Sequence, residues 1–231
     1  MSGIWVKVFP QEAVPGIGDW AKITGMTGDP QRVDYTEDDF EWTSFQWSGG
    51  AVSPSVTVTE GLLDVLIVGG GAAASSSFSG GGGGVIHGVQ EFSAGTHSII
   101  VGATKTSGGN FDGGRSAIGI DSIGGGLVRT AGPNGFQDFE AGGYGAGAGA
   151  TGDAPDADTG GPGYVSDING TSLEYAQGGG KYRSDPEVAA LPPGCGSDRQ
   201  NNSDVNQYRG TDGTVIVRVP TEYVTATEGW V

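Results

Sequence analysis

The sequence has few of the residues on which enzymes, disulfide scaffolds and nucleic-acid-binding proteins depend. Its 231 residues include one cysteine and two histidines, and 11 basic side chains stand against 27 acidic ones. The single cysteine, Cys195, excludes an internal disulfide framework. The net charge of −16 disfavours nucleic acid and anionic membranes as partners, because clustered lysine and arginine bind both. We attribute the acidic charge to solubility.

Long apolar segments are also missing. No stretch of about 20 apolar residues is present, so the sequence predicts no membrane insertion. The opening residues, Met1–Trp5, lack both the basic region and the apolar run of a signal peptide. We therefore expect a protein that is not secreted by that route.

Patterns for catalysis and metal binding are sparse. His87 and His97 fall in separate predicted strands, and neither a nucleophile elbow nor a zinc motif accompanies them. We predict no enzymatic activity and no cofactor. Asp153, Asp156 and Asp158 come closest to a metal cluster. Their segment offers fewer than the roughly six oxygen ligands that calcium requires, so no metal is predicted.

Leucine is scarce and glycine is abundant. Valine and isoleucine number 33 against six leucines, and branched side chains favour strands. We predict an all-β fold, a short-stranded antiparallel sandwich or jelly-roll-like sheet with long glycine-rich loops. The 47 glycines give the unfolded chain a large entropy. Such a chain is ordered only by close backbone packing or by neighbours in a larger assembly.

Two Val/Ile strands organise the chain. Asp64–Val68 runs into Gly69–Gly71, and Gly213–Val219 closes the glycine-rich part. We divide the chain into a Trp-rich N-terminal docking region (1–47), a glycine-rich β domain (48–220) and a C-terminal tail (221–231). Further short strands are predicted at Ile4–Phe9, Trp20–Thr24, Phe45–Trp47, Ser55–Thr59, Val85–Phe92 and His97–Gly102.

The glycines after the first of these strands also fit a dinucleotide-binding turn. Residues 69–74 match G-x-G-x-x-A, and Glu91 follows at a tolerable distance. That chemistry needs a helix directly after the glycines. Serines and then Gly80–Gly84 follow instead, and each interior glycine costs a helix about 0.8–1 kcal/mol relative to alanine. We therefore favour a structural role for this segment.

Tryptophan gathers at the two ends of the chain. Because tryptophan is enriched at anchors of protein interfaces, one interpretation is a docking face that holds the protein to a larger particle. An ordinary aromatic core is the alternative, and the sequence favours neither. The residues are Trp5, Trp20, Trp42, Trp47 and Trp230. Among them lies the acidic segment Asp34–Glu41, which we predict to be a solvated edge.

Four segments, taken in order, resemble the glycine-rich domain of bacteriophage tail and tail-fibre proteins. They are Val65–Gly71, Gly80–Val89, Ala94–Ala103 and Gly210–Pro220. The resemblance covers about residues 45–220. It implies a minor tail protein of the virion, at the tail tip or fibre, whose glycine-rich part contacts the host cell surface. It also implies other tail proteins as partners and a homo-oligomer, often a trimer.

The sequence departs from that family in two places. Ala72–Ser79 interrupts the first glycine run, and residues 165–209 are poor in glycine. Some tail adhesins pack polyglycine II segments into bundles of three-fold helices, which asks for glycine at every third position or in unbroken runs. Within 143–149 glycine recurs at every second residue, a period that suits a flat strand. A polyglycine bundle is thus allowed but not indicated.

Aromatic residues of the glycine-rich region are the candidate contacts with a host glycan, because sugar rings have flat apolar faces. Packing in small cores is the alternative. The candidates are Phe136, Phe139, Tyr144, Tyr164, Tyr175 and Tyr182. The alternative function is a secreted glycine-rich surface or ice-binding protein without catalytic activity. It predicts a signal peptide and a fixed glycine period, and neither is seen.

Overall fold

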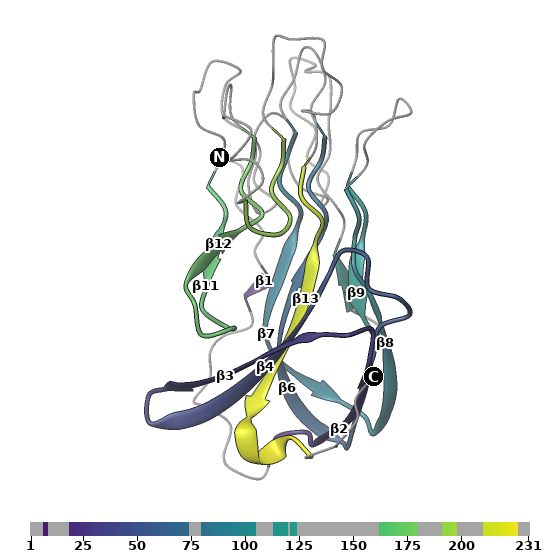
Figure 1. Ribbon diagram of the computed structural model, residues 1–231, viewed down its shortest axis with the longest axis vertical. Helices are drawn as coiled ribbons and strands as arrows, with labels where there is room; N and C mark the ends of the chain where they lie inside the picture. Colours follow the sequence, from purple (N-terminus) through teal and green to yellow (C-terminus); the bar gives the residue numbers. More distant parts are fainter. Residues whose placement is uncertain are drawn as a thin grey trace.

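The structure, a computed structural model, describes residues 7–8, 19–73, 80–104, 113–119, 121–123, 162–179, 191–197 and 210–225. These residues form sheets that are antiparallel except for the pairing of β1 with β7, so the predicted all-β class is confirmed (Figure 1). The strands are β1 (Lys7–Val8), β2 (Ile23–Thr27), β3 (Gln31–Glu37), β4 (Phe40–Ser48), β5 (Ser55–Val58), β6 (Gly61–Val68), β7 (Val85–Phe92), β8 (Gly95–Ile100), β9 (Ser116–Ile118), β10 (Asp121–Ile123), β11 (Tyr164–Ser166), β12 (Leu173–Tyr175) and β13 (Thr214–Pro220), and a 3-10 turn, η2 (Thr221–Tyr223), follows β13.

The strands form three sheets. A six-stranded sheet has the order β1-β7-β6-β13-β4-β3, a five-stranded sheet has the order β10-β9-β8-β5-β2, and β11 pairs with β12 alone. The two organising strands predicted from the sequence, β6 and β13, are antiparallel neighbours inside the larger sheet. Their register places Thr214 opposite Val68 and Arg218 opposite Asp64.

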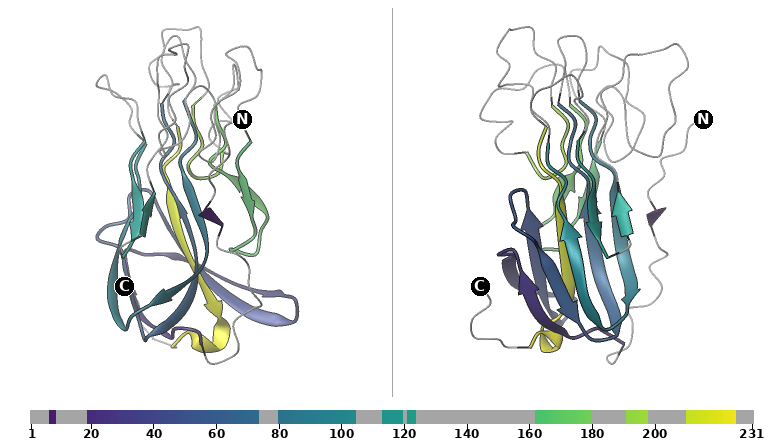
Figure 2. Two further views of the ribbon diagram at one scale, coloured as in Figure 1. Left: turned by 180° about the vertical axis from the view of Figure 1, so that it is seen from behind. Right: turned by 90° about the vertical axis from the view of Figure 1, so that its right-hand side faces the viewer.

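Both faces of β6 and β13 are covered, which explains their nearly continuous apolar sequence. On one face, Val65 and Val217 join a core with residues of the five-stranded sheet such as Val56. On the other face, Leu66 and Ile216 pack under the β11–β12 hairpin. The protein is therefore layered, with the six-stranded sheet between the five-stranded sheet and the hairpin (Figure 2).

The polar strands were not predicted. β3 alternates between exposed and half-buried residues, so it lacks the Val/Ile signal of the central strands. β11 and β12 have three residues each.

The boundary proposed between residues 47 and 48 falls inside β4, which pairs with β13 along residues 42–48. Residues from the described part of 1–47 thus belong to the same two large sheets as the rest.

Candidate functional site

Extended segments continue side by side beyond the ends of the central strands (Figure 2). None of their residues is assigned to a strand, yet backbone hydrogen bonds join them throughout. The segments are 69–73, 80–84, 101–104, 113–115, 176–179, 191–197 and 210–213. We call this set the glycine bundle.

Hydrogen bonds in the glycine bundle repeat every third residue. Three consecutive amides of segment 69–73 donate to three different neighbours, and the fourth returns to the first neighbour. These bonds run from Gly69 to Gly84, Gly70 to Gly114, Gly71 to Thr211 and Ala72 to Gly81, with N···O distances of 2.9–3.0 Å. A β-strand has a period of two and bonds within one sheet. A period of three is that of a polyproline II-type helix, so the segments pack as polyglycine II-type helices.

A second segment follows the same rule. Gly80 and Gly83, three residues apart, both donate to segment 191–197, each at 2.8 Å. The sequence left a polyglycine bundle open without indicating it, and these hydrogen bonds favour one. Glycine is needed only where two backbones touch, and Ala72, in the same segment as Gly71, is buried without displacing a neighbour.

The contacts that demand glycine join residues distant in the sequence. A Cβ on Gly71 would lie 1.9 Å from the carbonyl oxygen of Cys195, and a Cβ on Gly113 would lie 1.9 Å from that of Gly70. No non-bonded heavy atoms approach so closely in a folded protein, so these positions exclude every side chain. The backbone packing predicted from the glycine content is present.

The described segments of the glycine bundle end together at one end of the protein. β6 is antiparallel to β7 and β13, and β8 is antiparallel to β9. The segments that follow β6 and β8 and those that precede β7, β9 and β13 therefore lie at the same end of the protein (Figure 2). Figure 1 shows this end at the top, opposite the strands that carry the two-sheet core.

The dinucleotide-binding interpretation of 69–74 is contradicted by the bundle. Pyrophosphate binding requires free amides, whereas those of Gly69, Gly70 and Gly71 are all donated to carbonyl groups of this chain.

In the described ranges, no three residues of the types His, Cys, Asp and Glu lie close enough together to hold a metal. Asp153, Asp156 and Asp158 lie outside those ranges. No described helix is long and apolar enough to cross a membrane.

Two of the six candidate glycan-binding aromatics lie in the described part of the chain. Tyr175 is fully buried, packed against the apolar face of β6, so its prediction as a surface contact was wrong. Tyr164 is half-buried, and its hydroxyl lies 2.8 Å from Nδ1 of His87. The other four, Phe136, Phe139, Tyr144 and Tyr182, fall outside the described residues.

The described tryptophans belong to the core. Trp20, Trp42 and Trp47 are 5, 6 and 0% exposed. The first two form an edge-to-face pair with ring centroids 5.5 Å apart, and Trp47 donates its indole N–H to the carbonyl of Thr27 at 2.8 Å. Side chains sealed in this way cannot anchor a partner, so the aromatic-core alternative holds for these three. Trp5 and Trp230 lie outside the described residues.

A buried charged cluster on the hairpin side of the large sheet was not predicted. The Arg218 guanidinium donates to Asp64 Oδ2 from Nη2 at 2.6 Å and to Glu37 Oε2 from Nη1 at 2.7 Å. Its carbon lies 4.5 Å from the ring centroid of Trp42. Burial is the largest influence and disfavours the charged guanidinium, but Asp64 and Tyr35 together outweigh it and raise the pKa of Arg218. The two ion pairs of Arg218 thus link β13 to β6 and to β3.

The same cluster fastens the β11–β12 hairpin to the sheet. The Tyr35 hydroxyl donates to the carbonyl of Ile168 at 2.7 Å and accepts from Arg218 at 3.1 Å. Nε2 of His87 lies 3.6 Å from Asp64 Oδ1, and its Nδ1 faces the hydroxyl of Tyr164. The hairpin is thereby joined to four strands of the large sheet.

We expect the stability of the protein to fall as the pH drops below neutrality. Burial lowers the pKa of His87, although the charge of Asp64 opposes the shift. The unfolded chain, with a histidine pKa of about 6.5, then binds the proton more readily than the folded protein. The contribution of His87 is complete above that value and is lost as the pH falls through the lower, folded pKa.

Thermal unfolding of the wild type and of His87→Gln between pH 8 and pH 5 measures this effect. The wild type should lose more of its Tm than the variant across that interval. Asp34, whose pKa is lowered, and Tyr175, whose pKa is raised to about 12, titrate outside it. Parallel curves for the two proteins would show that His87 carries no pH dependence.

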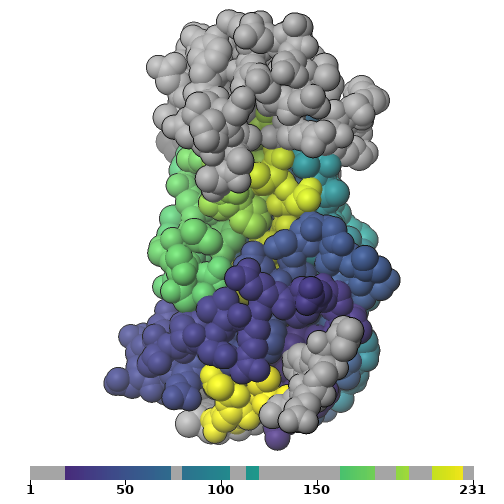
Figure 3. Space-filling view, in the orientation of Figure 1, coloured from purple at the N-terminus to yellow at the C-terminus, as the bar shows by residue number. Residues whose placement is uncertain are grey.

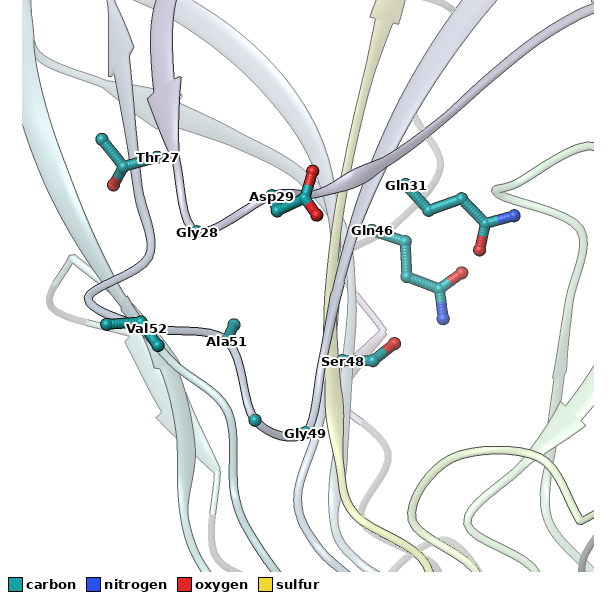
Figure 4. A pocket seen from close by; sticks show the side chains of 10 residues that line it. Thr27, Gly28, Asp29, Gln31, Gln46, Ser48, Gly49, Ala51 and Val52 are labelled. Atoms are coloured by element: carbon teal, nitrogen blue, oxygen red, sulfur yellow. The ribbon is translucent and has the colours of Figure 1, made fainter. Parts of the chain in front are cut away.

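An open hollow lies beside β4, between the β2–β3 and β4–β5 connections. Its volume is about 690 Å³. The side chains of Gln31, Gln46 and Ser48 project on one side of β4, and those of Thr27 and Val52 lie on the other (Figure 4). Because these groups do not converge on a common point, we assign no ligand to it.

Comparison of the chain with protein-family models, curated proteins and solved structures finds no match in any of the three. Function is therefore inferred from the residues, the geometry and the resemblance carried by the four segments.

Proposed function

We propose that this protein is a structural component of a bacteriophage tail, a minor tail protein at the tail tip or on a tail fibre that contacts the host cell. The glycine bundle is the single observation that carries the proposal. Most of its segments continue from β6, β7, β8, β9 and β13 and lie side by side at one end of the protein, joined by backbone hydrogen bonds (Figure 2). Binding residues concentrate on connections that a rigid scaffold positions.

Backbone hydrogen bonding gives such a support unusual freedom of sequence beyond its end. Many of the bonds between segments, such as those that Gly70 and Gly194 donate, use only main-chain atoms. The register of the bundle therefore depends mainly on its backbone. This arrangement fits a protein that contacts a cell surface from a rigid support.

The net charge agrees with a virion role that does not involve nucleic acid. A net charge of −16 repels phosphate. The partners we propose are other tail proteins and a host cell-surface glycan, without a cofactor and without membrane insertion.

Immunogold electron microscopy tests the virion assignment. Antibodies raised against the purified protein should label the distal end of the tail in virions of the phage that encodes it. Virions that contain the protein but carry the label on the capsid would overturn the tail assignment. Virions that lack the protein would overturn the virion role altogether.

Adsorption measurements test the contact with the host separately. The purified protein should bind host cells and slow adsorption of the same phage, and heat-unfolded protein should do neither. Tail labelling without competition would leave a structural tail protein and remove the adhesive role.

A further inference from the structure

β3 is the outer strand of the six-stranded sheet, and its free edge is exposed. It pairs with β4 along all seven residues, whereas no strand in the described ranges pairs with its other side. The β3–β4 hairpin lies on the surface of the protein (Figure 3). An open edge presents unpaired amides and carbonyls to any strand of matching register.

The turn fixes which residues point outward. Asp38 and Asp39, with φ of 48° and 67°, form a two-residue connection that makes Glu37 and Phe40 opposite partners. The two residues that flank a turn of this kind exchange main-chain hydrogen bonds. Hydrogen-bonded and non-hydrogen-bonded residue pairs then alternate along the two strands. The main-chain groups of Arg32, Asp34 and Thr36 therefore face away from β4.

Charge selects one way for two copies of this edge to meet. Antiparallel self-pairing is symmetric about a two-fold axis, and an axis at Val33 places Arg32 of each copy opposite Asp34 of the other. Within one copy, Arg32 Nε already lies 3.0 Å from Asp34 Oδ1. The four side chains would then alternate in sign around a square. An axis at Asp34 would instead oppose two like charges, which is unfavourable.

We propose that the protein forms a two-fold dimer through antiparallel pairing of β3 with β3 of a second copy, with Val33 on the axis. Charged residues on an edge often prevent pairing, but Arg32 and Asp34 complement their own copies in this register. Both side chains are about half exposed, at 47% and 54%, and so are free to share a partner. Pro30, which lacks an N–H, lies opposite Thr36 and ends the pairing.

The dimer goes beyond the tail function and does not depend on it. Each copy has one β3 edge, so the pairing closes at two copies. The trimer implied by the resemblance would need a different contact.

Crosslinking through a new cysteine tests the register. Residues opposite each other in a non-hydrogen-bonded antiparallel pair have Cα atoms about 4.5 Å apart, within the range for a disulfide. Val33→Cys should therefore form a covalent dimer on mild oxidation. Thr36→Cys is the matched control, since it lies on the same edge but opposite Pro30. The wild type controls for Cys195, which is buried.

Charge exchange on the full-length protein gives a second, independent measurement. In analytical ultracentrifugation the wild type should have a mass of about twice 23.2 kDa, the mass of one chain. Arg32→Asp or Asp34→Arg alone should raise the dissociation constant about tenfold, because each places like charges opposite each other twice. The double variant that combines Arg32→Asp with Asp34→Arg should restore the wild-type dissociation constant. A monomeric or trimeric wild type, equal crosslinking of the two cysteine variants, or no rescue by the exchange would overturn the proposal.

Discussion

Alanine in place of Gly71 is expected to destabilise the protein by about 3 kcal/mol or more. The new Cβ would lie 1.9 Å from the carbonyl oxygen of Cys195, which belongs to a neighbouring backbone and cannot rotate away. Overpacking a close-packed site costs about 1–3 kcal/mol. Separating the two segments also breaks backbone hydrogen bonds, at about 1 kcal/mol each. Because a chain of this length loses roughly 2–4 °C per kcal/mol, the Tm should fall by about 6–12 °C.

Two other glycines provide matched controls. At Gly25 the nearest atoms to a new Cβ are those of Thr57, at 3.6 Å, so Gly25→Ala should leave the Tm unchanged or slightly higher. Gly50 has open space around it but a φ of 89°, so Gly50→Ala should cost only the strain of a left-handed residue, about 1–2 kcal/mol. Thermal unfolding followed by circular dichroism distinguishes the three.

The order of the three Tm values decides whether backbone packing in the glycine bundle stabilises the protein. If Gly71→Ala unfolds at the same temperature as Gly25→Ala, the segments are not packed through their backbones. A Gly71→Ala protein without any cooperative transition would agree with the prediction, because the bundle contains the continuations of β6, β7 and β13.

The central strands were predictable because their chemistry is local. Val85–Phe92 was predicted with the bounds of β7, and Ser55–Thr59 differs from β5 by one residue. Branched residues between glycine turns specify a strand without reference to any partner. β3 was missed because an edge strand faces solvent and needs no apolar alternation, as its exposed Arg32 and Asp34 show.

The glycine bundle could not be found by searching for a period in the sequence. Gly71 must be glycine because of Cys195, and Gly113 must be glycine because of Gly70. Such requirements join segments that are more than 40 residues apart, so they leave no repeat within any one segment. The glycine content predicts backbone packing, whereas only the structure assigns the partners.

The charged cluster, by contrast, left a signal that sequence reasoning overlooked. Asp64 and Arg218 each interrupt an otherwise apolar strand, and those two strands were already predicted to organise the chain. Buried charges occur in pairs. Aligning the two strands in antiparallel register would have placed these residues opposite each other, as they are in the structure.

Arg218→Met is expected to cost about 3–5 kcal/mol, because it leaves a carboxylate without its partner in the core. The Asp64 side chain is 6% exposed and cannot turn to water, whereas that of Glu37 is 33% exposed and can. The variant also loses the hydrogen bond that Arg218 donates to Tyr35. At about 2–4 °C per kcal/mol, the Tm should fall by roughly 6–20 °C.

Removing both charges separates the cost of the unpaired carboxylate from the value of the pair. Replacing a buried ion pair by apolar residues of similar size is often neutral, so Asp64→Leu combined with Arg218→Met should recover at least half of the loss. Arg32→Met, measured at a concentration at which the protein is monomeric, is the matched control for the exposed pair of Arg32 and Asp34 and should cost about 0–1 kcal/mol. A double variant no more stable than Arg218→Met would show that the ion pair itself, and not relief of a lone charge, holds β6, β13 and the hairpin together.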